Sequence, residues 1–570
     1  MKLPMLSHTP LRLVVLFGGL LLPGFAQTIK ISTDLQNLLT NPLGSVNVIV
    51  QYNAAPSILD LSQISLLGGT VTRQYSLTPA VAARLPIADV IALANSLSIR
   101  LVSLDRQLGA TLDYSDAAVN ASSAASYGLD GSGVAIAVID SGIADHPDLM
   151  NSQGTASRVV HRESFVPYTR FDDYGHGTHV AGIIAGNGRS STGVGSTRTL
   201  QGVAPKANLV DLRVLDAAGS TNDSLVLAAI ERAWQLKSKY NIRVVNLSLG
   251  RPIYDTYALD PLCNAVAAAS KSGLVVVIAA GNLGRNGYGT ILSPANSPQA
   301  ITVGAMKTMA TYSRTDDLVA SYSSKGPTYI DGLVKPDVVA PGNLVVSLLS
   351  SGSTLSNAYG SNVVDPSYYT THTLSSAQYF RMSGTSMATP VVSGAAALMI
   401  QKDPSLSPDT VKARLMKTAY KSFPATSTVY DPATGQTYTS QYDIFTIGAG
   451  YIDIAAALSN HDVATGTAAS PHLTVKPLEK QVYVTGDPAT VWNGSSTWTD
   501  NAVWGTSVLQ PGTLGTNAVW GTNAVWGTNA VWGTNAVWGT NAVWGTNAVW
   551  GTNAVWGTNA VWGTGTKSEQ

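Results

Sequence analysis

Residues 134–140, VAIAVID, form an unbroken apolar run that ends on a single carboxylate, Asp140. A short run of alanine and β-branched residues is typical of a strand buried on both faces of a sheet. Helix-like segments alternate with further runs of this kind, namely ANLVDLRVL at 207–215, IRVVNLSLG at 242–250, LVVVIAAGN at 274–282 and AITVGAM at 300–306. This alternation predicts an α/β fold with a parallel sheet covered by helices on both faces.

Three reactive side chains lie at the ends of such segments. Asp140 ends the first run, His176 lies in DYGHGTHVAG, and Ser386 lies in SGTSMATP before a helix-like segment. A serine hydroxyl attacks carbonyls well only when an imidazole takes its proton, and that imidazole needs a carboxylate to orient it. Strand ends and helix starts meet at one edge of a parallel sheet. Each residue alone has an ordinary structural explanation, but together they predict acyl transfer.

Asn282 follows another buried run, in AAGNLG. Taken alone, this asparagine is typical of a turn. A helix that starts at Ser386 presents free backbone N–H groups and a partial positive charge, which suit a developing oxyanion. The side-chain amide of Asn282 is then the expected second donor.

The segments around these residues resemble the subtilisin-type serine proteases, the subtilase family. IDSGI at Asp140, HGTHVAG at His176, AAGN at Asn282 and GTSMATP at Ser386 occur in the family's order. Further similar segments are QGVAP at 201–205, NLSLG at 246–250, SSKGP at 323–327, KPDVVAPG at 335–342 and GAGYIDIAAAL at 448–458. The resemblance implies a subtilisin-like catalytic domain over 113–460.

The resemblance also implies roles for particular residues. Ser386 would be the nucleophile, His176 the base and then the acid, Asp140 the orienting carboxylate, and Asn282 an oxyanion donor in a serine endopeptidase. The backbone of the segment that contains Ser248, Leu249 and Gly250 would pair with an extended polypeptide substrate. No cofactor is implied for catalysis.

The N-terminal part predicts export and self-inhibition. Residues 1–26 contain basic residues, an apolar run and small residues before Ala26, which is typical of a signal peptide and predicts a secreted or cell-surface protein. Residues 28–107 show an α+β pattern without an obvious reactive side chain, and they resemble the family's inhibitory propeptide. The enzyme itself would cut this propeptide away between about Asp105 and Tyr114.

The composition argues against a nucleic-acid partner and excludes an intrachain disulfide. Of the 570 residues, 34 are basic and 34 acidic, so no strongly charged face indicates nucleic acid. Cys263 is the single cysteine, so no intrachain disulfide forms, and its helix-like surroundings predict a buried core residue.

Two residues raise the question of a metal ion. Asp148 in HPDL resembles one calcium-ligand position of the family, but the loop that completes that site is altered, so a structural calcium rests on one carboxylate. His179 lies three residues after His176, whereas the zincin pattern spaces two histidines four apart around a glutamate, so we expect no zinc site.

The C-terminal part departs from the family. A polar linker is expected over 461–491, and 492–565 contain the recurring hexapeptide WGTNAV. Because six is even, an extended strand would display every tryptophan on one side. Such a stripe could stack on cell-surface polysaccharide, form a solenoid or self-associate, and a low-complexity tail is the alternative. A second interpretation of the whole chain is therefore a surface-binding protein in which the protease domain is subordinate or inactive.

Overall fold

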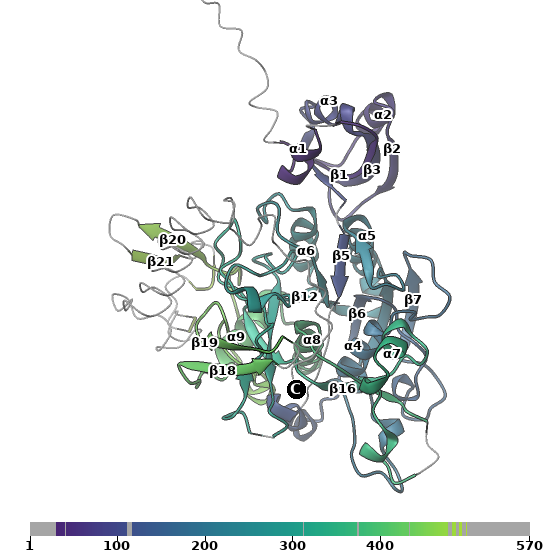
Figure 1. Cartoon of the computed structure of the whole chain (residues 1–570), viewed down its shortest axis with the longest axis vertical. Helices are drawn as coiled ribbons and strands as arrows, with labels where there is room; N and C mark the ends of the chain where they lie inside the picture. Colours follow the sequence, from purple (N-terminus) through teal and green to yellow (C-terminus); the bar gives the residue numbers. More distant parts are fainter. Residues whose placement is uncertain are drawn as a thin grey trace, which may run out of the picture.

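The computed structural model describes residues 30–498 apart from 40–41, 106, 111–116, 312, 373–375, 432–433, 477–480, 486–489 and 493–496. The predicted signal peptide and the repeats beyond residue 498 lie outside the described residues. Figure 1 shows a small N-terminal unit above a larger α/β body. No helix within the described part combines the length and apolar character needed to cross a bilayer.

The body is built on a sheet that has eight strands within the described residues, in the order β14-β13-β12-β10-β6-β8-β7 with β15 beside β13. Every pair is parallel except β13 with β14, which lies antiparallel at one edge. The predicted parallel sheet is therefore confirmed, with one antiparallel edge strand added. The strands are β6 (Ala135–Asp140), β7 (Val159–Ser164), β8 (Asn208–Arg213), β10 (Ile242–Leu247), β12 (Val275–Ala279), β13 (Ile301–Lys307), β14 (Leu318–Val319) and β15 (Val338–Pro341).

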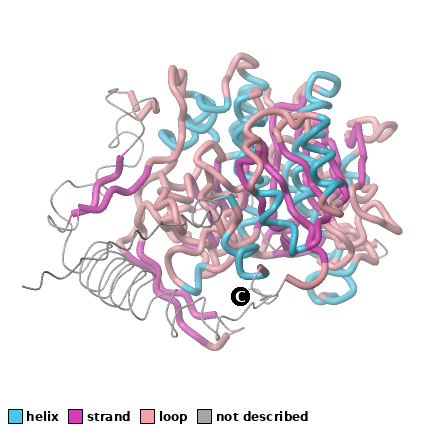
Figure 2. The backbone as a smooth tube through the Cα atoms, turned by 90° about the horizontal axis from the view of Figure 1, so that it is seen from above, coloured by secondary structure: helices cyan, strands magenta, loops and turns pink. Residues whose placement is uncertain are grey.

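Helices cover both faces of this sheet, as Figure 2 shows from above. Ile136 and Val138 of β6 face one core, while Ala135, Ala137 and Ile139 face the other, because successive side chains of a strand alternate. The first core contains α4 (His176–Ala185), α8 (Thr385–Lys402), α9 (Pro408–Thr418) and α10 (Ile454–Ser459). The second contains α5 (Asp223–Tyr240) and α6 (Pro261–Lys271), and Cys263 of α6 is buried, as expected.

The N-terminal unit is a four-stranded antiparallel sheet in the order β2-β3-β1-β4. Strand β3 was not predicted, because its alanines and Arg84 lack a clear strand alternation. One face of this sheet packs on α5 and α6 through Ile49, Tyr75 and Ala82. The elements are α1 (Thr33–Leu38), β1 (Ser45–Tyr52), α2 (Ile58–Leu66), β2 (Thr70–Gln74), β3 (Ala80–Pro86), α3 (Val90–Ala94) and β4 (Ile99–Leu104).

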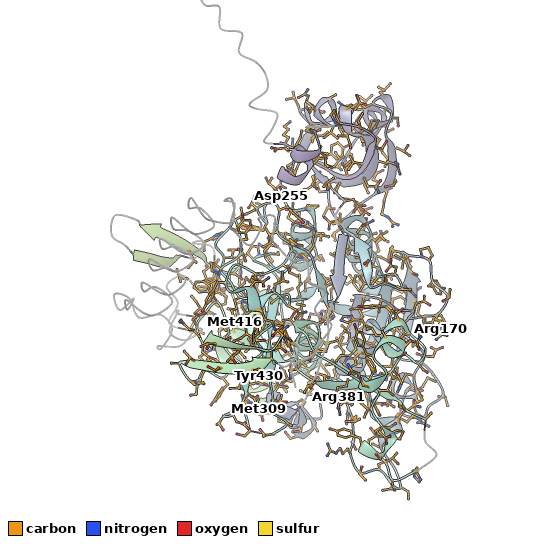
Figure 3. The ribbon with its side chains drawn as sticks, viewed as in Figure 1. Arg170, Asp255, Met309, Arg381, Met416 and Tyr430 are labelled. Atoms are coloured by element: carbon orange, nitrogen blue, oxygen red, sulfur yellow. The ribbon has the colours of Figure 1, made fainter. Side chains whose placement is uncertain are left out.

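Smaller elements surround the body. The side chain of Tyr430 on β18 is 60% exposed, whereas that of Met416 on the core helix α9 is 1% exposed; Figure 3 labels both residues. The peripheral elements are β16 (Val345–Leu348), α7 (Thr354–Ala358), β17 (Tyr379–Met382), β18 (Thr426–Asp431), β19 (Gln436–Gln441), β20 (His472–Lys476) and β21 (Gln481–Thr485).

The first two tryptophans of the C-terminal part pack against the α/β body. Trp492 and Trp498 are both buried in the first core. The indole N–H of Trp492 donates to the carbonyl of Ala469 at 2.7 Å, and the Nζ of Lys417 lies 5.3 Å from the ring centre of Trp498. These two side chains are therefore not part of an exposed aromatic stripe. The later tryptophans lie outside the described residues.

Candidate active site

Asp140 and His176 meet as the sequence predicts. Asp140 is the last residue of β6, and His176 is the first residue of α4. The Nδ1 of His176 lies 2.7 Å from Oδ1 of Asp140, and both side chains are fully buried. The same carboxylate oxygen accepts the backbone N–H of Ser141 at 2.7 Å. Burial lowers the local dielectric and so strengthens this contact, which fixes the orientation of the imidazole.

Gly175 sets the start of α4. This residue has a φ of +103°, a left-handed conformation in which a side chain would be strained. Thr178, in the first turn, donates its hydroxyl to Asp172 and accepts the backbone N–H of Ala144. The helix therefore begins at His176, and the left-handed backbone of Gly175 precedes its first turn.

Ser386 is the second residue of α8, at the helix end where backbone N–H groups are free. Its hydroxyl donates to the carbonyl of Ser248 at 3.1 Å, and the hydroxyl of Ser248 donates back to the carbonyl of Ser386 at 2.9 Å. Pro390 lies four residues further along, inside the helix rather than in its first turn. Because proline has no N–H for the carbonyl of Ser386, Ser248 supplies the missing hydrogen bond.

Asn282 is fixed by Thr385, the residue before Ser386. Its Oδ1 accepts the backbone N–H of Thr385 at 2.8 Å and the hydroxyl of Thr385 at 3.1 Å. With the oxygen held in this way, the amide presents its NH2 group as the remaining donor. The structure thus brings Asn282 to the start of α8, beside Ser386.

A strand from the N-terminal part lies along the same region. β5 (Gln107–Ala110) is the central strand of a three-stranded sheet, between β11 (Leu249–Gly250) and β9 (Ser220–Asn222). Both pairs are antiparallel, with Leu249 opposite Ala110 and Gly250 opposite Gly109. The backbone of Leu249 and Gly250 therefore pairs with an extended segment of the chain itself.

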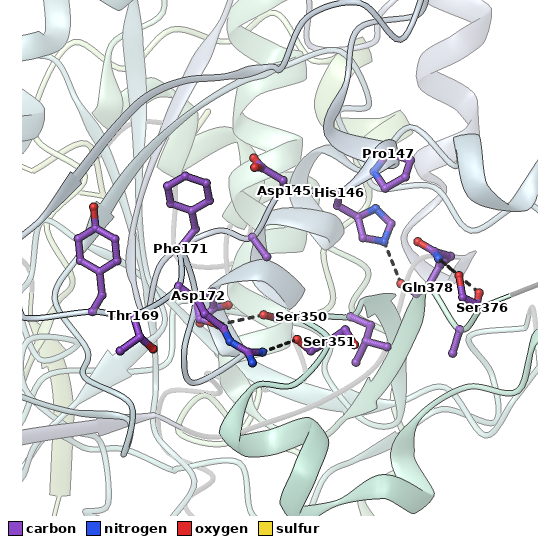
Figure 4. A pocket seen from close by; sticks show the side chains of 15 residues that line it. Asp145, His146, Pro147, Thr169, Phe171, Asp172, Ser350, Ser351, Ser376 and Gln378 are labelled. Carbon is purple, nitrogen blue, oxygen red and sulfur yellow. Dashed lines mark hydrogen bonds between the residues drawn. The ribbon is translucent and has the colours of Figure 1, made fainter.

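Sequence reasoning missed several residues around this site. Ser141 and Asp172 connect the end of β6, with Asp140, to the start of α4, with His176, and Thr385 holds Asn282. A cavity of about 530 Å³ lies beside the loop containing Asp172. Phe171 and His146 contribute to the lining of this cavity (Figure 4). The lining of this cavity does not include Asp140, His176 or Ser386.

The surroundings of Asp148 do not fit the calcium-ligand role that the resemblance implies. Its Oδ2 accepts the hydroxyl of Tyr379 at 2.6 Å, and its Oδ1 accepts the backbone N–H of Ser190 at 2.7 Å. The buried guanidinium of Arg158 donates to its carbonyl at 2.7 Å. Protein donors and a fixed positive charge thus already surround the oxygens that a cation would need.

His179 is a buried residue of α4. Its Nε2 lies 3.1 Å from the carbonyl oxygens of both Val345 and Phe380. Burial, assisted by the nearby His176, lowers the pKa of His179 to about 3, so the ring is neutral. Across the described part of the chain, no group of three or more His, Cys, Asp or Glu side chains is arranged to hold a metal ion.

Comparisons with known proteins agree with this geometry. The subtilase family model matches residues 131–430, which is more than half of the chain. This chain belongs to the subtilase family. The subtilase is 40% identical over 331 residues to serine protease AprX of Bacillus subtilis strain 168, covering 56% of this chain and 69% of that relative. It is 34% identical over 408 residues to subtilisin E of the same strain, covering 69% of this chain and 92% of the relative.

A solved structure also shares the fold of this subtilase. Fervidolysin from Fervidobacterium pennivorans, described as a keratinolytic enzyme related to subtilisin, matches with a TM-score of 0.55 at 22% identity. The match covers 74% of this chain and 62% of that one. The subtilase has a subtilisin-like α/β fold and is a serine endopeptidase, with polypeptides as its substrates.

Proposed function

We propose that Asp140, His176 and Ser386 hydrolyse peptide bonds through an acyl-enzyme. Ser386 attacks the carbonyl carbon, His176 takes the hydroxyl proton and then gives it to the leaving amine, and Asp140 orients the ring and stabilises its charged form. Water then releases the acyl group by the same steps in reverse. The observation that carries the proposal is the 2.7 Å contact between the buried Asp140 and His176.

The oxyanion of the tetrahedral intermediate is bound by the Nδ2 of Asn282 and the backbone N–H of Ser386. Support comes from the hydrogen bonds of Thr385 to Oδ1 of Asn282, which leave the NH2 group as the donor. The start of α8 adds a partial positive charge at the same place.

The backbone of Ser248, Leu249 and Gly250 binds substrate as an added antiparallel strand. Support comes from β5, which already pairs with β11 in this way. Backbone hydrogen bonds of this kind recognise an extended chain whatever its side chains are. We therefore propose that flexible or unfolded polypeptide is the substrate.

Residues 28–107 act as an inhibitory propeptide that the protease removes by its own activity. Support comes from the packing of this unit on α5 and α6 and from β5, which continues the chain into the proposed substrate groove. The register pairs position 110 with 249, so one further step would set position 111 opposite Ser248. The hydroxyl of Ser386 contacts the carbonyl of Ser248, and we therefore place the cut after Thr111, outside the described residues.

Export of the protein and the role of its repeats remain predictions. A cleaved signal peptide over 1–26 would place the protease outside the cytoplasm, either secreted or at the cell surface. Repeats over 492–565 would contact cell-surface polysaccharide through the tryptophans that follow Trp498. The catalytic domain over 113–460 and a linker over 461–491 complete the proposed organisation.

Casein digestion tests the proposed activity. The purified full chain is compared with its Ser386→Ala variant, and both are analysed by N-terminal sequencing. We expect the parent to digest casein and to begin at residue 112, whereas the variant should be inactive and keep its propeptide. Equal digestion by both proteins would overturn the nucleophile assignment, and an uncut but active parent would overturn self-processing.

A further inference from the structure

Asp172 is a fully buried carboxylate for which the steps above assign no role. Its Oδ1 accepts the hydroxyl of Ser141 at 2.8 Å and the backbone N–H of Gly175 at 2.7 Å. Its Oδ2 accepts the backbone N–H of Thr178 at 2.9 Å and the hydroxyl of Thr178 at 2.6 Å. Four donors thus converge on one side chain, which offsets the cost of burying it.

These four donors come from the two segments that hold the proposed catalytic pair. Ser141 directly follows Asp140, while Gly175 precedes His176 and Thr178 lies in the first turn of α4. The hydroxyl of Ser141 also accepts the backbone N–H of Gly177 at 2.8 Å. Asp172 and Ser141 therefore join the end of β6 to the start of α4 on both sides of His176.

The backbone of Asp172 is also held, by Ser350. The hydroxyl of Ser350 donates to the backbone carbonyl of Asp172 at 2.9 Å, a contact visible in Figure 4. The next residue, Asp173, turns the other way and contacts Arg213 at 2.8 Å. Its oxygens also accept hydrogen bonds from Thr169 and Arg170. Two adjacent aspartates therefore stabilise one loop, and only Asp172 contacts the segments that carry Asp140 and His176.

We propose that Asp172 is a positioning residue that sets the distance and angle between Asp140 and His176. The inference rests on the proposed triad and goes beyond it by assigning its preorganisation to a buried carboxylate. Rates depend steeply on such geometry, because a misplacement of about 1 Å can reduce a rate about 10²-fold. A side chain that binds both segments limits that movement.

Asp172→Asn tests the proposal, with Asp173→Asn as the matched control. The amide keeps the shape of the carboxylate but has only one acceptor oxygen, so its NH2 group faces donors of Ser141 and Gly175 or of Thr178. With a short peptide substrate, we expect Asp172→Asn to lower kcat about 10- to 100-fold with little change in KM. Asp173→Asn should keep kcat within about threefold, because the side chain of Asp173 makes its hydrogen bonds to Thr169, Arg170 and Arg213 and to neither of the segments 140–141 and 175–178.

The pH profile separates positioning from general stability. A loosened Asp140 stabilises the imidazolium less, so the acidic limb of kcat/KM should move to lower pH in Asp172→Asn and stay in place in Asp173→Asn. Ser141→Ala removes the link from the other side, and it serves as the second variant if Asp172→Asn does not fold. Where both fold, the double variant should lose less than the product of the two single losses.

Each outcome bears on the proposal. Equal kcat and equal pH profiles in Asp172→Asn and Asp173→Asn would overturn the positioning role. So would a full-rate Ser141→Ala in a case where Asp172→Asn fails to fold. An inactive parent would instead overturn the proposed function on which the inference rests.

Discussion

In the proposed mechanism, Asn282 acts through one atom of its side chain, the amide nitrogen that remains available when Thr385 holds the oxygen. Asn282→Ala removes that donor from the developing oxyanion and leaves Asp140, His176 and Ser386 in place. We expect kcat to fall about 10²- to 10³-fold, the size established for subtilisin itself, with KM nearly unchanged. Steady-state kinetics on a short peptide checks this, and a variant with full kcat would exclude Asn282 as the donor.

Asp211 is a residue where pH should act on stability. Burial raises the pKa of Asp211 to about 8 although Arg162 opposes the shift. An unfolded aspartate has a pKa near 3.9, so the folded state holds this proton more tightly. Its contribution to stability is therefore complete below about pH 4 and is lost as the pH rises through about 8.

Asp211→Asn removes this titration and keeps an oxygen that can accept the N–H of Ile143. In a Ser386→Ala background, which prevents self-digestion, the urea midpoints are measured at pH 5 and pH 9. The parent should lose more stability over that range than the Asp211→Asn variant. Parallel losses in the two proteins would contradict the raised pKa.

The sequence predicted the site residues that lie in distinctive motifs. It missed those whose place in the site depends only on hydrogen bonds. Asp140 and Ser386 adjoin apolar runs and glycines that restrict their surroundings. Asp172 lies in a polar loop, FDDYG, where an aspartate is ordinary. Its role depends on contacts with Ser141 and Thr178, which only the folded chain brings together.

At the scale of elements, β17 contacts the segment containing Asp148 directly. Tyr379, at the start of β17, donates its hydroxyl to Asp148. We expect EDTA to leave the thermal midpoint of a Ser386→Ala background unchanged. Tyr379→Phe should destabilise that background by about 1–3 kcal/mol, because a buried acceptor loses its partner.

Tyr430→Phe is the matched control, since Tyr430 lies exposed on β18. Calorimetry of both variants, with and without EDTA, makes the comparison. A midpoint that falls on chelation and recovers with calcium would show that a bound ion stabilises the fold. An unchanged midpoint for Tyr379→Phe would remove the hydroxyl from the explanation.

Elements were predictable where burial on both faces imposed a continuous apolar run. The run 134–140 became β6, and 274–282 contains β12. Strand β3 escaped prediction because Ala82 and Ala83 indicate no particular element, and its place depends on pairing with β1 and β2. Strand β5 escaped for a related reason, because its partners β9 and β11 are distant in sequence.

At the scale of the whole molecule, two units share a core and one strand crosses between them. The N-terminal sheet packs on α5 and α6, and β5 continues from it between β9 and β11. The chain therefore continues from the N-terminal unit directly into the proposed groove. Under the proposed self-processing, this arrangement would keep Ser386 covered until the first cut.

Covalent labelling of the nucleophile tests the central claim most directly. The full chain is treated with phenylmethylsulfonyl fluoride, and the modified residue is located by mass spectrometry of the whole protein and its peptides. We predict one sulfonyl group on Ser386, with fluoride lost, and much slower labelling in His176→Ala, because the hydroxyl is no longer activated and the N-terminal unit is no longer cut away. A label on another residue, or equal labelling rates in the parent and His176→Ala, would contradict the account.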